Sequence, residues 1–148
     1  MISFHHIAIQ TRDLDNCLAW YRDYFGVEEK WTLDEFSPLT LSRLPGITRL
    51  TEVRVGDVRL HLFERADLVY DPVAERAAQF QHVCVATESP QELSVRRDRW
   101  IEVFESKNYA FARPDQPTEI VVDDEGIQSF YLFDVNGLEF EFTYVPVD

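Results

Sequence analysis

Two of the four histidines of this chain lie in matching sequence contexts. His6 belongs to FHHIAIQT, residues 4–11, and His82 belongs to FQHVCVAT, residues 80–87. The two segments lie about half a chain length apart and indicate an internal repeat. A lone strand histidine is more often a packed core or rim residue than a ligand. One structural histidine would not predict a second at the equivalent position, so the pair is a candidate for metal binding.

Two further segments, one in each half, alternate between apolar and polar residues as half-buried strands do. In 57–64, His61 lies on the less apolar face, and in 138–145 Glu139 and Glu141 share such a face. Spacing alone does not choose between the two glutamates. A carboxylate facing a cavity is costly unless it is paired or bound to a metal. Imidazole with carboxylate suits one divalent ion of Fe, Mn, Co, Ni or Zn.

The elements that must position these residues repeat in the same order. Strand, helix, strand, strand and strand are expected in each half, with a β-α-β-β-β order that indicates an α+β fold. The first half is expected to hold strands at 4–11, 27–34, 48–55 and 57–64, and a helix between the cap Asp13 and Gly26. The second is expected to hold strands at 80–87, 118–123, 128–134 and 138–145, and a helix opened by Ser89 and Pro90. The segments 35–47 and 106–117 are expected to be loops.

These elements define residues 1–65 as a first module, 66–79 as a linker and 80–148 as a second module. A module this short cannot bury both faces of its sheet alone. Paired modules would form a curved, barrel-like sheet around a cavity, with His6 and His82 directed inward. We expect one structural domain, although pairing between two chains in a homodimer is equally allowed.

Composition excludes several partners. Apolar residues make up 45% of the 148 residues, enough for a packed core, and the formal net charge is −13. Such an acidic surface repels nucleic-acid phosphates and anionic lipid, so we expect a small-molecule substrate instead. No stretch approaches the roughly 20 apolar residues of a membrane-spanning helix. Cys17 and Cys84 lack zinc-type spacing, and we expect both to be buried free thiols in a cytoplasmic protein.

The chain resembles the vicinal oxygen chelate superfamily, which contains glyoxalases, epimerases, extradiol dioxygenases and antibiotic-binding resistance proteins. HHIAIQTRDLDNCLAWYRDYFG is similar to the family's opening strand and helix, and FDVNGLEFEF is similar to its closing turn and strand. The resemblance implies paired βαβββ modules forming an open barrel around a metal ion. It implies His6 and His82 as ligands, and it selects Glu141, seven residues after Asp134, over Glu139.

The resemblance also implies a fourth ligand on the last strand of the first module, which His61 matches in VRLHLFE. The turn before it differs by one residue from that of the second module. A second departure is Val135, which stands where the family usually has proline.

Three functions are compatible with this site. The first is a divalent-metal-dependent lyase or isomerase of glyoxalase or epimerase type, in which the metal stabilises an enediolate-like intermediate and Glu139 is the first candidate for the proton-transfer base. The second is an Fe(II) dioxygenase of extradiol type, with His6, His82 and Glu141 as ligands. The third is a metal-free antibiotic-binding resistance protein, in which Trp20, Trp31 and Trp100 would suit a planar cation. A complete ligand set favours the first.

Overall fold

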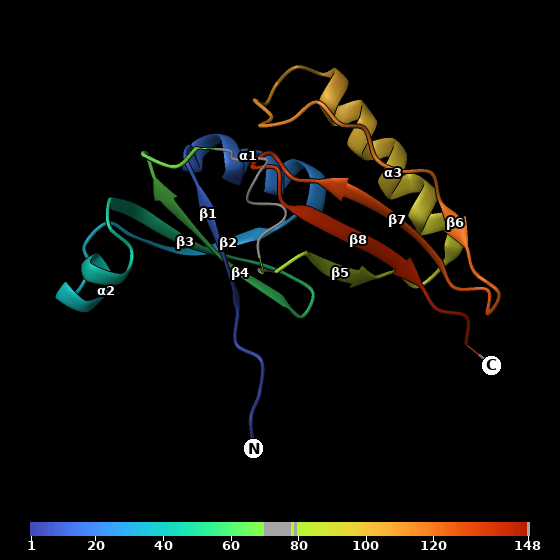
Figure 1. Ribbon diagram of the computed structural model, residues 1–148, viewed down its shortest axis with the longest axis horizontal. Helices are drawn as coiled ribbons and strands as arrows, with labels where there is room; N and C mark the ends of the chain where they lie inside the picture. The colour runs from blue at the N-terminus through green and yellow to red at the C-terminus, as the bar shows by residue number, and fades with distance from the viewer. Residues whose placement is uncertain (70–77, 79, 148) are drawn as a thin grey trace. The chain divides into compact units, whose positions relative to one another are not determined.

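The computed structural model describes residues 1–69, 78 and 80–147 (Figure 1). The chain divides into two compact units, Met1–Val69 and Tyr70–Asp148, called unit 1 and unit 2 below. Most of the expected linker, 66–79, lies outside the described residues. None of the described helices is long and apolar enough to cross a membrane.

Unit 1 is one four-stranded mixed sheet with two helices. Its elements are β1 (Ile7–Thr11), α1 (Leu14–Phe25), β2 (Glu28–Leu33), α2 (Pro38–Arg43), β3 (Ile47–Val55) and β4 (Val58–Arg65). The strand order is β1-β4-β3-β2, with β1 parallel to β4 and the other pairs antiparallel. After β1 the chain passes through α1, β2 and β3, and β4 then pairs with β1.

Unit 2 repeats this topology. Its elements are β5 (His82–Ala86), α3 (Pro90–Glu105), β6 (Val121–Val122), β7 (Gln128–Phe133) and β8 (Glu139–Tyr144). The strand order is β5-β8-β7-β6, and β5 is parallel to β8. The expected α+β fold of two βαβββ modules is confirmed, and each sheet is open rather than closed into a barrel.

Local signals define helix α1. The side chain of Asp13 accepts a hydrogen bond from the backbone N–H of Asn16 at 3.0 Å, which caps the N-terminus. Gly26 ends the helix with a φ of 70°, a left-handed conformation that glycine adopts without a Cβ penalty. Between these caps the apolar positions form one buried face: Leu14, Cys17, Leu18, Trp20, Tyr21 and Tyr24.

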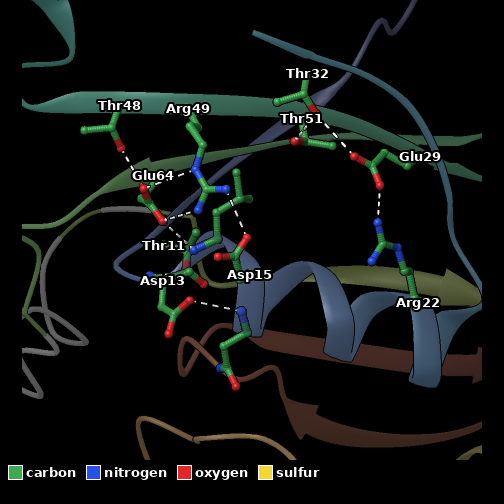
Figure 2. A network of polar contacts seen from close by, with 12 residues as sticks. Thr11, Asp13, Asp15, Arg22, Glu29, Thr32, Thr48, Arg49, Thr51 and Glu64 are labelled. Carbon is green, nitrogen blue, oxygen red and sulfur yellow. Dashed lines mark hydrogen bonds and ion pairs between the residues drawn. The ribbon is translucent and has the colours of Figure 1, made fainter. Parts of the chain in front are cut away.

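Glu64 joins the end of β4 to the start of α1 (Figure 2). Its carboxylate accepts hydrogen bonds from the backbone N–H of Leu14 at 2.9 Å and from Thr48 Oγ1 at 2.7 Å. Arg49 forms an ion pair with it at 3.0 Å. A negative charge beside the first residue of a helix also complements the helix dipole. The sequence predicts an exposed strand end for residue 64, and this prediction is wrong because α1 and β3 supply the partners.

Helix α3 is capped by Ser89, whose side chain accepts from the N–H of Glu92, and Pro90 occupies its first turn. Its buried residues are Leu93, Trp100 and Val103. The indole Nε1 of Trp100 donates to the carbonyl of Phe133 on β7 at 2.8 Å. This bond satisfies the one polar group of a fully buried ring.

The two faces of each sheet differ in chemistry. On the face that carries Ile9, Val53, Leu60 and Leu62, every one of these side chains is at least nine-tenths buried, and α1 contacts β4. In unit 2, Phe130, Leu132, Phe140 and Phe142 form the corresponding buried face, which α3 contacts through β7 and β8. The opposite face of each sheet, called the site face below, carries His61 in unit 1 and Glu141 in unit 2, as strand alternation predicts.

Several boundaries differ from the expectations. The segment 35–47 is not only a loop, because Ser37 caps the six-residue helix α2 and Pro38 opens it. This helix is too short to show a periodic pattern in the sequence. Strand β1 begins at Ile7 instead of residue 4, and β5 begins at His82 instead of residue 80. Residues 4–6 and 80–81 before them are not paired with a neighbouring strand. Strand β6 contains two residues instead of the expected 118–123.

The two cysteines also differ. Cys17 is fully buried in α1, as expected, whereas Cys84 on the site face of β5 is exposed. The expectation of a buried Cys84 is wrong because the apolar alternation of β5 places Val83 and Val85 on the helix side and leaves residue 84 on the other.

Candidate functional site

In unit 1 the site face brings His61 and Glu52 together. They are cross-strand partners on β4 and β3, and Nε2 of His61 lies 2.8 Å from Oε2 of Glu52. The carboxylate accepts the ring hydrogen, which leaves Nδ1 of His61 with the lone pair that could coordinate a metal. The edge of Trp31, from β2, contacts the same imidazole with ring centroids 5.1 Å apart.

Glu52 is a site residue that the sequence analysis did not identify. Its side chain is 3% exposed, and its Oε1 accepts a hydrogen bond from Nε of Arg54 at 2.8 Å. Burial alone would raise the pKa of Glu52, but hydrogen bonds from His61 and Arg54 and the charge of Arg59 lower it to about 2. Glu52 is therefore an anion at neutral pH. A charged residue in the β-branched pattern LTEVRV of β3 was the only sequence signal for it.

His6 lies immediately before β1 and stacks on His61, with ring centroids 3.8 Å apart. Its Nδ1 lies 2.8 Å from Nδ1 of His5, whose Nε2 lies 2.7 Å from the guanidinium of Arg59. Partial burial lowers the pKa of His6, and the neighbouring His61, His5 and Arg59 lower it further. A neutral imidazole is the form that binds metals.

These contacts also restrict which nitrogen of His6 is available. Arg59 can only donate, so His5 accepts at Nε2 and donates from Nδ1 to Nδ1 of His6. The hydrogen of His6 then resides on Nε2. Coordination of a metal through Nε2 would require the contact between His5 and His6 to change.

In unit 2, Nε2 of His82 lies 3.0 Å from Oε2 of Glu141. The amide nitrogen of Gln81 donates to Glu139 at 3.0 Å, so its amide oxygen faces Nδ1 of His82. Nδ1 therefore carries the ring hydrogen, and Nε2 presents a lone pair to the carboxylate of Glu141. Two acceptors at this distance need a proton or a metal ion to hold them together. Two cis ligands at about 2.1 Å from a metal would also lie about 3.0 Å apart.

Cys84 and Tyr131 are the cross-strand partners of Glu141 on its two sides. Although Cys84 is exposed, the protein atoms around its thiol partly desolvate it and raise its pKa to about 11. The charge of Glu141 and a hydrogen bond to it contribute. Burial and the same carboxylate raise the pKa of the Tyr131 hydroxyl. Both groups are protonated at neutral pH and donate to Glu141, which orients its carboxylate.

The strand registers show that His61 and Glu141 occupy equivalent positions. In β4, His61 pairs with Ala8 of β1, and in β8, Glu141 pairs with Cys84 of β5. Residues 8 and 84 correspond in the internal repeat. The one-residue difference between the two hairpin turns therefore does not displace His61 from the position that Glu141 holds.

The structure thus brings the four predicted ligands together in pairs, His6 with His61 and His82 with Glu141. Glu139 lies on the same strand face as Glu141 and pairs with His82 in the register. Within the described residues, no group of three or more His, Cys, Asp or Glu side chains is arranged to hold a metal ion.

One family model matches residues 3–142, almost the whole chain: the Glyoxalase/Bleomycin resistance protein/Dioxygenase superfamily. The chain belongs to this superfamily. The resemblance to the vicinal oxygen chelate proteins is therefore confirmed. Members of the superfamily often bind a divalent metal ion and include both enzymes and resistance proteins. None of the curated proteins compared with the chain matches it.

Solved structures of this superfamily share the fold. A domain from Frankia sp. EAN1pec has a TM-score of 0.74 at 14% identity and covers 99% of this chain and 93% of its own. Lactoylglutathione lyase from Agrobacterium tumefaciens has a TM-score of 0.59 at 24% identity, covering 96% and 92%. The fosfomycin resistance protein FosX of Listeria monocytogenes, in complex with Mn(II) and sulfate, has a TM-score of 0.62 at 16% identity, covering 99% and 96%.

The donor types in each unit of this superfamily member are ones that divalent metal ions bind. Nδ1 of His61 and Nε2 of His82 carry lone pairs, and Glu141 offers a carboxylate oxygen. Each of these two rings is oriented by a hydrogen bond from its other nitrogen, to Glu52 or to Gln81. Such outer contacts fix the tautomer of metal-binding histidines.

Proposed function

We propose that this protein is a divalent-metal-dependent enzyme of glyoxalase or epimerase type. Its metal ligands in this proposal are His6, His61, His82 and Glu141. The observation that supports it best is the contact between Nε2 of His82 and Oε2 of Glu141, an imidazole nitrogen and a carboxylate oxygen 3.0 Å apart. The matching positions of His61 and Glu141 in the two registers support these two ligands. His6 would bind after its contact with His5 changes.

The metal ion would supply Lewis-acid stabilisation to substrate oxygens that gain negative charge in the reaction. The protein would supply the rest of the site. Glu52 would hold His61 in one tautomer, and Cys84 and Tyr131 would hold the carboxylate of Glu141. Glu139, whose Oε2 is held by Gln81, would accept a proton from the substrate carbon next to the chelated oxygens.

The metal content of the protein tests the proposal. The chain is purified without a histidine tag and its metals are measured by mass spectrometry, before and after incubation with Mn, Fe, Co, Ni or Zn. We expect about one ion per chain, and a loss of more than half of it in the variants His6→Ala, His61→Ala, His82→Ala and Glu141→Ala. Glu119→Ala, which removes an exposed carboxylate paired with Arg97, is the matched control and should retain the ion. Protein that takes up none of these metals overturns the proposal.

A second assay separates proton transfer from oxygen chemistry. Metal-loaded protein is incubated in D₂O with 2-oxo or acyl-CoA compounds, and deuterium exchange at the carbon next to the carbonyl is followed by NMR. Glu139→Gln should reduce exchange by about 10²- to 10⁴-fold while leaving metal content unchanged. Oxygen consumption with catechols, and no exchange with any 2-oxo compound, would favour an Fe(II) dioxygenase instead.

The burial of two tryptophans speaks against a planar cation as ligand. Trp20 and Trp100 are fully buried in the cores of their units, where they contact neighbouring aromatic rings. Of the three tryptophans, Trp31 is the exposed one, at 38%, and could contact a ligand. Trp20 and Trp100 therefore do not support the metal-free antibiotic-binding function.

A further inference from the structure

An open pocket lies on the site face of unit 1, next to the short helix α2. Its volume is about 260 Å³. Pockets for drug-sized molecules measure roughly 300–1,000 Å³, so this one suits a short acyl chain or a single ring. The residues that line it are Ala8, Leu39, Thr40, Arg43, Leu44 and Phe63.

The pocket adjoins the candidate ligand His61. Ala8 is the β1 partner of His61, and Phe63 follows it by two residues on β4. Residues two apart in a strand share a face and have Cα atoms about 7 Å apart. A molecule bound in the pocket would therefore lie beside the position at which His61 meets a metal.

The helix that walls the pocket carries Leu39 and Leu41 but contributes no buried side chain to the core. Leu39 is 69% exposed although it lines the pocket. In Figure 1, α2 lies on the other side of the sheet of unit 1 from α1. The apolar surface of Leu39 and Leu44 is thus available to the apolar part of a ligand.

Arg43 is the charged residue of the pocket. No ion pair or hydrogen bond joins it to another residue in the described part of the chain. Four other arginines of unit 1 have carboxylate partners: Arg22, Arg49, Arg54 and Arg59. Within the described residues Arg43 has no acidic partner, and a guanidinium beside an apolar pocket is suited to an anionic ligand.

We infer that this pocket binds an organic carboxylate with a short apolar chain, with Arg43 holding the carboxylate and Leu39, Leu44 and Phe63 contacting the chain. The inference rests on the proposed function, for which it specifies the substrate class: an acidic molecule whose reacting carbons lie near His61. The guanidinium fork matches a carboxylate with two parallel hydrogen bonds.

Octanoate is the probe, with 1-octanol and octylamine as its neutral and cationic counterparts. Binding is followed by the amide NMR signals of residues 38–44 during titration. We expect octanoate to shift these signals in a saturable way, and the two counterparts to bind at least fivefold more weakly. Arg43→Gln should weaken octanoate binding at least fivefold, and Leu39→Ser at least twofold. Arg12→Gln, which removes an exposed arginine elsewhere in unit 1, should leave it unchanged.

Absence of saturable shifts, equal binding of octylamine, or unchanged binding by Arg43→Gln overturns the inference. Because no residue of α2 is buried, these variants should keep the fold, and circular dichroism checks this. The titration is run with and without added metal. Octanoate binding at Arg43 in a protein that takes up no metal would support the pocket and overturn the proposed metal enzyme. Metal uptake without octanoate binding would support the proposed metal enzyme and overturn the pocket inference.

Discussion

Glu52 and His61 form a part-buried carboxylate–imidazole pair across strands β3 and β4, with Oε2 and Nε2 2.8 Å apart. Replacing Glu52 by glutamine removes the charge that fixes the tautomer of His61. Loss of such an outer contact typically lowers metal affinity by about 10- to 100-fold, and we expect this range for Glu52→Gln. Competition with a chromophoric chelator measures the affinity. Glu28→Gln, which alters an exposed ion pair with Lys30 on β2, is the control. Unchanged affinity in Glu52→Gln would mean that His61 does not bind the metal through Nδ1.

Glu64 makes the folding stability of unit 1 depend on pH (Figure 2). Burial would raise its pKa, but Arg49, the N–H of Leu14 and Thr48 lower it to about 2. In the unfolded chain its pKa returns to an ordinary value near 4.5. The stabilisation is therefore complete above about pH 4.5 and is lost as the pH falls toward 2.

The variant Glu64→Gln should be less stable than the parent by about 1.5–3 kcal/mol at neutral pH, the usual contribution of hydrogen bonds to a charged group. Urea unfolding between pH 2 and 7 measures the difference, which should shrink below about pH 4.5. Glu35→Gln removes an exposed carboxylate and should leave stability unchanged. A pH-independent difference would contradict the role of the charge.

The two thiols should differ in reactivity. Cys17 is buried and Cys84 is exposed, so a disulfide reagent should label one cysteine per folded chain. In chelator-treated protein at pH 8 the labelling should be slower than that of a free cysteine, because the pKa of Cys84 is raised to about 11 by burial and by Glu141. Glu141→Gln should accelerate it severalfold. Labelling of Cys17 at a comparable rate would contradict the packing of α1, and mass spectrometry of peptides identifies the site.

The hydrogen bond from Trp100 to the carbonyl of Phe133 should stabilise unit 2 measurably. Trp100→Phe keeps an aromatic ring but leaves a buried carbonyl without its donor and a gap beside it. We expect a loss of about 2–4 kcal/mol in chemical unfolding, from the missing partner and the lost volume. Trp31→Phe, at a partly exposed position of β2, is the matched control and should cost less than about 1 kcal/mol. Equal losses of unfolding free energy in the two variants would contradict the tighter packing of Trp100.

Much of the fold could be predicted from local sequence signals. The caps Asp13 and Ser89 and the terminating Gly26 act on neighbouring backbone, so they predict the helices directly. Alternation predicted which face of β4 and β8 lies away from the helices, because side chains in a strand point to opposite faces in turn. The short helix α2 could not be predicted this way, since six residues do not reveal a helical period.

The candidate site was predicted in part for the same reason. The repeat pointed to His6 and His82 without knowledge of any family. Only the tertiary structure decided that His61 corresponds to Glu141, because this follows from strand registers that join residues more than 50 positions apart. The tertiary structure also gave His61 its partner Glu52 and brought Glu64 to the N–H of Leu14. Pairing between distant strands depends on how the whole sheet packs, which no local pattern in the sequence encodes.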